Sequence, residues 1–212
     1  MVNFLHPPIF KFHTLFYNIV ILLTGGTSME ERDLYDINGN LTGETIYKGE
    51  PIPDGKYIAV VLCFIQNSKG DFLIQKRSAL KNGKYGSTSG HLETGESSIQ
   101  GMIREIKEEL NLDIAPAELE LLEHGRNDEE QFFFDIYYAK KDVILGDLAL
   151  QKEEVDFVEW DSLDKIQNLI DNNLFSPSHT EIFLRQKDTL RKKKLVFGDG
   201  GKKQVFEIQQ RR

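Results

Sequence analysis

The chain has 212 residues, a formal net charge of −8 at pH 7 and a single cysteine, Cys63. This length is enough for one domain with a sizeable buried core. The acidic balance argues against general nucleic-acid binding, which needs lysine and arginine to neutralise phosphates. One cysteine excludes an internal disulfide, and no cysteine–histidine cluster indicates zinc, so we expect a cytoplasmic protein.

The two ends of the chain differ from its middle. Residues 1–28 contain few acids, and their apolar run at 15–23 is too short to span a bilayer, so no membrane partner is expected. A signal sequence is an alternative, but acidic sequence begins directly after Met29. The codons just before Met29 can also spell a bacterial ribosome-binding sequence. We therefore interpret 1–28 as an untranslated leader or a disordered extension, and 195–212 as a tail without assigned structure or function.

The middle of the chain shows strand patterns bounded by turn residues. The dipeptide Asn38-Gly39 is typical of a hairpin turn, and apolar, β-branched runs follow it. Cys63 lies in the first of these runs, where we expect a small buried side chain and not a nucleophile. In chain order, the expected strands are a hairpin at 34–47 and residues 57–65, 71–77, 119–124, 131–139 and 155–160.

Three helices are expected between and after these strands. Ser97, with Gln100 three residues later, has the pattern of a capping box that starts the first. Ser162 is expected to cap the second, which runs to about residue 172, and the third covers 180–193. Strands around one helix, with further helices after them, indicate an α/β fold.

Residues 90–112, GHLETGESSIQGMIREIKEELNL, carry the strongest functional signal. In a helix, Glu105, Glu108 and Glu109 have i, i+3, i+4 spacing and share one face. Three negative charges on one face repel one another and destabilise the helix unless a cation binds there. Mg²⁺ typically binds one or two carboxylates together with substrate phosphate oxygens. A solvated acidic face is the alternative. The spacing of glycine, glutamate and arginine upstream favours the metal site.

That spacing resembles the Nudix box, in which Gly, five residues, Glu and seven residues precede Arg-Glu-apolar-x-Glu-Glu-x-Gly-apolar. The matching positions are Gly90, Glu96, Arg104, Glu105, Ile106, Glu108, Glu109 and Leu112. Asn111 stands where the family has its last glycine. That glycine supplies a left-handed helix cap, and asparagine is the next-best residue for this conformation, so the departure is expected to be tolerated.

The resemblance implies a fold and an activity. The fold is a Nudix-type α/β/α sandwich with a mixed sheet and a catalytic loop-helix, formed by residues 29–194. The activity is hydrolysis of a diphosphate linkage, in a nucleoside diphosphate-X or another organic diphosphate, by water attack assisted by Mg²⁺ or Mn²⁺. The expected partner is therefore a small diphosphate and not a nucleic acid, and a homodimer is left open.

The resemblance also implies roles for individual residues. The metal ligands would be Gly90, through its carbonyl, and Glu105, Glu108 and Glu109. Glu105 and Glu109 would be catalytic, while Glu96 and Arg104 are expected to form an ion pair that supports the site.

Two further roles stay open at the level of sequence. The candidates for the general base are Glu105, Glu129, Glu130, Glu153 and Glu154. The candidates for substrate binding are Lys76, Arg77, Lys84, His91 and Arg126. Aromatic residues between 132 and 138 would suit either a wall that stacks on a base or the core.

Two alternatives compete with the hydrolase. The segment GSTSGHLETGE is also similar to isopentenyl diphosphate isomerase, which shares the fold. His91 matches a metal-binding histidine of that enzyme, but Ser89 replaces its catalytic cysteine, and no histidine occurs between 48 and 65 to match the others. A non-catalytic, nucleotide-sensing Nudix domain is the second alternative, and it would usually carry a damaged box. Hydrolysis is therefore favoured.

Overall fold

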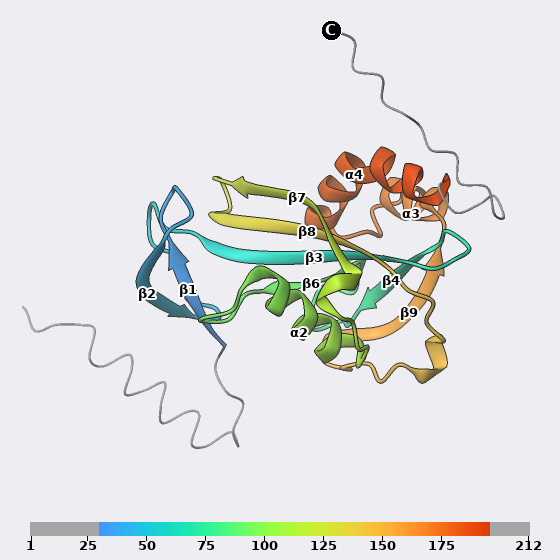
Figure 1. Ribbon diagram of the computed structural model, residues 1–212, viewed down its shortest axis with the longest axis horizontal. Coiled ribbons are helices and arrows are strands. Elements are labelled where there is room, and N and C mark those ends of the chain that lie inside the picture. Colours follow the sequence, from blue (N-terminus) through green and yellow to red (C-terminus); the bar gives the residue numbers. More distant parts are fainter. Residues whose placement is uncertain (1–29, 196–212) are drawn as a thin grey trace, which may run out of the picture.

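The computed structural model of the protein describes residues 30–195 (Figure 1). The predictions for residues 1–28, for a start at Met29 and for the tail after Leu195 lie outside these residues.

A mixed sheet forms the centre of the fold. Its path is β5-β4-β3-β8-β7, with β6 paired to β3 and β9 to β4; β3 and β8 are parallel, and the other pairs are antiparallel. The predicted strands are present, and the mixed sheet is confirmed. The short β5 was not predicted, because two residues are too few to show an alternating pattern. The strands are β3 (Ile58–Gln66), β4 (Phe72–Arg77), β5 (Tyr85–Gly86), β6 (Thr88–His91), β7 (Leu119–Asn127), β8 (Phe132–Lys140) and β9 (Val155–Asp161).

The predicted N-terminal hairpin forms a separate two-stranded sheet. It consists of β1 (Glu31–Tyr35) and β2 (Leu41–Tyr47), which are antiparallel. The Asp36 carboxylate accepts two backbone N–H groups across the turn, which stabilises it. Leu34 is buried and packs in one apolar cluster with Ile58 of β3. The hairpin is thereby attached to the end of the central sheet (Figure 1).

Helices cover both faces of the sheet, so the α/β/α sandwich is confirmed. Side chains alternate along β3, and Cys63 and Leu62 therefore face opposite layers. The Cys63 layer packs against α2 (Ser98–Leu110), and burial raises the pKa of this thiol. The Leu62 layer packs against α3 (Leu163–Asp171) and α4 (Pro177–Leu195). Figure 1 shows the box helix α2 on one side of the sheet and the two C-terminal helices on the other.

The helix boundaries agree with the capping residues. Ser162 caps α3, and its hydroxyl accepts a backbone N–H from the first turn. The side chain of Gln100 accepts the Ser97 N–H at the start of α2. Helix α4 begins at Pro177 and not at 180, because proline is well accommodated in a first turn. Within residues 30–195, no helix is long and apolar enough to cross a membrane.

Candidate active site

The box helix α2 is capped by Asn111, the residue that stands where the family has glycine. Asn111 has φ 52° and ψ 31°, which is the left-handed conformation, and its N–H donates to the Lys107 carbonyl at 2.8 Å. Asparagine therefore closes the helix where the family has glycine, and the prediction is confirmed.

The three box carboxylates differ in exposure. Glu109 is 6% exposed, while the side chains of Glu105 and Glu108 are 14% and 48% exposed. Burial raises the pKa of Glu109 to about 8 and that of Glu105 to about 7, and the charge of Glu105 adds to the effect on Glu109. Among the described residues, the one hydrogen-bond donor to the Glu109 side chain is the Gln75 amide, at 2.8 Å. Two buried carboxylates thus face one cleft, and no ion pair to Glu109 is found among the described residues.

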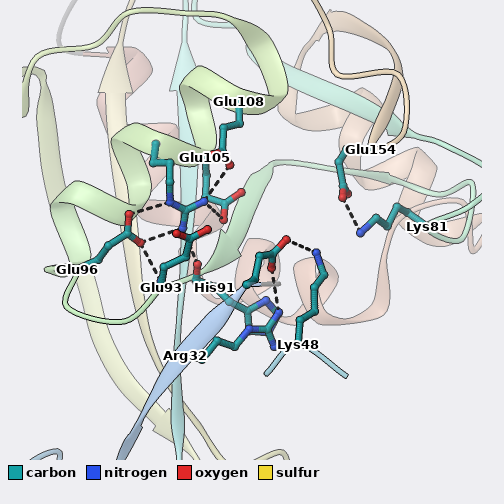
Figure 2. A network of polar contacts seen from close by, with 11 residues as sticks. Arg32, Lys48, Lys81, His91, Glu93, Glu96, Glu105, Glu108 and Glu154 are labelled. Atoms are coloured by element: carbon teal, nitrogen blue, oxygen red, sulfur yellow. Dashed lines mark hydrogen bonds and ion pairs between the residues drawn. The ribbon is translucent and has the colours of Figure 1, made fainter. Parts of the chain in front are cut away.

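Arg104 connects the loop, the strand and the helix of the box. Its Nε donates to Glu96 at 2.7 Å, so the predicted ion pair is present. Its Nη1 lies 2.9 Å from carboxylate oxygens of both Glu105 and Glu108, and its Nη2 donates to the His91 carbonyl at 2.8 Å. Figure 2 labels the partners Glu96, Glu105, Glu108 and His91, and dashed lines mark these contacts. Such charge-assisted bonds hold the acidic side chains in a defined orientation.

Gly90 makes room for the Glu105 carboxylate. A Cβ at this position would lie 1.9 Å from the carboxyl carbon of Glu105. Only glycine therefore allows the Glu105 side chain to lie directly against β6.

The residues at this site fit a divalent cation. Among residues 30–195, no group of three acidic, histidine or cysteine side chains is gathered closely enough to form a complete metal cage. Mg²⁺ does not need one, because it commonly takes one or two carboxylates and completes its shell with water and substrate phosphate. The buried oxygens of Glu105 and Glu109 match this requirement.

The carboxylates line a cleft of about 460 Å³. Four cationic side chains also line it, namely Arg32, Lys48, Arg77 and Lys81. An apolar wall comes mainly from β3 and β8, and its residues are Ile58, Val60, Leu62, Phe132, Phe134 and Ile136. By contrast, Tyr137 and Tyr138 belong to the two core layers. The cleft therefore combines acidic, basic and apolar surfaces, as an organic phosphate requires.

The structure brings two of the five substrate-binding candidates to the cleft, Arg77 and His91. The other three lie elsewhere, each with its own partner: Lys76 over the Tyr85 ring, Lys84 at Asn173 and Arg126 at Asp128. Their selection for nearness in sequence was wrong for the cleft as described, since neighbours such as Lys76 and Arg77 point to opposite faces of a strand. Arg32, Lys48 and Lys81 were not predicted to line the cleft, because no local pattern in the sequence marks them.

Three of the five candidates for the general base line the cleft: Glu105, Glu130 and Glu154. Glu129 and Glu153 are exposed and are not among the described lining residues. Glu154 forms an ion pair with Lys81 at 2.6 Å.

A buried histidine from α4 completes the cleft next to Ser89. The Nδ1 of His179 accepts the Ser87 backbone N–H at 3.1 Å, and burial lowers the pKa of His179 to about 3. The ring is therefore neutral at pH 7 and carries its proton on Nε2, which lies 3.1 Å from Ser89 Oγ and donates to it. His179 consequently cannot take the proton of Ser89, and this pair does not form an activated serine nucleophile.

Comparison with known proteins agrees with this geometry. The model of the NUDIX domain matches residues 56–182. An uncharacterised Nudix hydrolase of Listeria monocytogenes is 37% identical over 155 residues, which cover 70% of this chain and 89% of that protein. Another, from Clostridium acetobutylicum, is 32% identical and covers 69% of this chain and 77% of its own length. The crystal structure of DR0079 from Deinococcus radiodurans shares the fold, with a TM-score of 0.63 at 21% identity, and covers 74% of this chain and 98% of that one.

Proposed function

We propose, from the premise that this chain belongs to the Nudix hydrolase family, that it cleaves the diphosphate linkage of a nucleoside diphosphate-X or similar organic diphosphate. The observation that carries the proposal is the pair of buried carboxylates, Glu105 and Glu109, facing a cleft that also presents cations. In a metal-bound diphosphate, the metal ion would pair with the carboxylates, and the phosphate oxygens would pair with the cationic side chains. The lone cysteine, Cys63, is buried and reduced, which fits a cytoplasmic enzyme.

In this proposal Glu105 and Glu109 hold a Mg²⁺ or Mn²⁺ ion, with Glu108 and the Gly90 carbonyl as further ligands. When bound, such an ion polarises the phosphate and lowers the pKa of water. Arg104 keeps Glu105 and Glu108 from turning away, because it binds both, and Glu96 supports Arg104 from the loop.

The chain's own residues then position the substrate and move a proton. Glu105 is the proposed general base, because its carboxylate lines the cleft and is held there by Arg104. Arg77 and the neutral His91 face the same cleft and contact substrate oxygens. The apolar wall of β3 and β8 excludes water from the reacting phosphate. Phosphoryl transfer requires mainly such positioning and charge stabilisation.

A phosphate-release assay tests the proposal. Purified protein is incubated with a panel of nucleoside diphosphate derivatives and other organic diphosphates, with Mg²⁺, with Mn²⁺ and with a chelator. We expect metal-dependent release from at least one substrate class, abolished by chelation. Substrate binding without release from any member of the panel would instead indicate a nucleotide-sensing domain.

A further inference from the structure

Arg32 is a buried cation that comes from outside the matched family region. It lies in β1, whereas the NUDIX domain match begins at residue 56. Side chains alternate along this strand, and Arg32 and Leu34 are the two that face inward. Leu34 enters the core, while Arg32, which is 9% exposed, lines the cleft.

The guanidinium of Arg32 is poorly satisfied by the chain. Within residues 30–195 its Nε is buried without a hydrogen-bond partner. Its one ion pair there, from Nη2 to Glu30, has a length of 3.5 Å, and Lys48 binds the same carboxylate. A buried charge is costly unless it is well paired, and arginine offers five donors. One carboxylate shared by two cations leaves net positive charge at the cleft, and one donor of Arg32 has no partner within the described residues.

The hairpin is held in place beside the box. The Thr94 N–H donates to the Glu31 carbonyl at 2.9 Å, and the Gly95 N–H donates to the Asp33 carboxylate at 2.8 Å. These bonds attach β1 to the loop that precedes the box helix. Arg32 therefore approaches the cleft from a supported strand, and its charge acts on His91 of β6 (Figure 2).

We propose that Arg32 binds a phosphate oxygen of the diphosphate, with Lys48 beside it, so that the N-terminal hairpin completes the substrate site. The planar fork of a guanidinium matches phosphate oxygens, and the Arg32 side chain lines the cleft with one long ion pair, to Glu30, within the described residues. The inference rests on the proposed function. The charge of Glu30, which pairs with Arg32, acts on Glu105, whereas the charge of Arg77 acts on Glu109. The proposed contact therefore lies toward Glu105.

Calorimetric titration of the full chain with methylenediphosphonate in Mg²⁺ tests this contact, since the probe cannot be hydrolysed. Arg32→Ala is expected to raise Kd about 10- to 100-fold, in line with a lost bond to a charged group. Arg32→Lys should recover part of the loss. Arg191→Ala, which removes an equal charge from an exposed ion pair on α4, should leave Kd unchanged.

Glu30→Gln distinguishes a binding role from a structural one. If Arg32 and Lys48 bind the anion, removing their competing carboxylate should lower Kd several-fold. If the ion pair only stabilises the hairpin, Glu30→Gln should weaken binding or lower Tm as Arg32→Ala does, and this outcome would overturn the proposal. An unchanged Kd in folded Arg32→Ala would overturn it as well, even if the wild type hydrolyses diphosphates. A wild type that binds the probe but hydrolyses nothing would contradict only the proposed function.

Discussion

The acidic and the basic sides of the cleft are built in different ways. The box carboxylates of the acidic side come from one short stretch of chain, in which β6 and α2 place Gly90, Glu105 and Glu109 together. The basic side is assembled from the hairpin, β4 and the loop after β4, and it brings Arg32 and Lys81 to the same space. The acidic side depends on local helical spacing, whereas the basic side depends on how distant strands pack.

The two sides also differ in the charge that they bury. Burial raises the pKa of Glu105 and Glu109, although Arg104 binds Glu105 and the charge of Arg77 acts on Glu109. On the basic side, Arg32 shares one weakly placed carboxylate with Lys48. A metal ion would therefore pair with the acidic side, and the phosphate that it binds would pair with the basic side. Substitutions on each side, and at the glycine and histidine that shape the cleft, test this comparison.

The largest effect is expected on the acidic side. Glu109→Gln removes the charge of the most buried ligand while keeping its shape, so turnover should fall by orders of magnitude. Because Gln can still accept the Gln75 amide, Tm should change little. Steady-state kinetics with Mg²⁺ and thermal unfolding measure both quantities. Near-normal metal-dependent activity in this variant would refute the assignment of Glu109.

Gly90→Ala should have the next largest effect. Its Cβ would lie 1.9 Å from the Glu105 carboxyl carbon and would displace that side chain. A shift of about 1 Å in a catalytic group can cost about 100-fold in rate. Gly146→Ala is the matched control, since no atom lies within 4 Å of its added Cβ. Equal kcat values for the two variants would show that Glu105 does not need this close approach.

His179 should make stability depend on pH. Its pKa is lowered from 6.5 to about 3 in the folded chain, so the unfolded chain binds a proton that the folded chain excludes. This contribution is present above pH 6.5 and is lost as the pH falls toward 3. Between pH 6.5 and 5, wild type should lose about 2 kcal/mol more of its unfolding free energy than His179→Gln does. Urea unfolding at both pH values measures this, and parallel losses would show that His179 is protonated in the fold.

Ser89→Ala should have the smallest effect. His179 donates to Ser89, so the hydroxyl is not activated as a nucleophile, and hydrolysis needs no proton from it. Diphosphate cleavage should stay within about tenfold of wild type, or about 1.4 kcal/mol in barrier. Isopentenyl diphosphate should give no dimethylallyl product. Isomerisation that disappears in Ser89→Ala would favour the isomerase alternative.

Much of the fold could be read from local patterns. The hairpin at Asn38-Gly39, the strand around Cys63 and the capping of α3 by Ser162 all depend on residues close in sequence. The left-handed Asn111 was expected for the same reason, since a helix end is a local structure. The start of α4 was placed too late, because the pattern of its apolar residues does not reveal that Pro177 opens the first turn.

The sequence by itself determined the resemblance to the Nudix family and the acidic helix face, because both follow from spacing within one segment. The α/β class followed from the strand pattern, and the α/β/α sandwich was implied by the resemblance. Only the tertiary structure decided which cations share the cleft. Lys84 and Arg126 are not among its described lining residues, whereas Arg32 and Lys81, which are far apart along the chain, line it together. The physical reason is that strand pairing and layer packing set distances between remote residues, and one sequence without its fold carries no record of those distances.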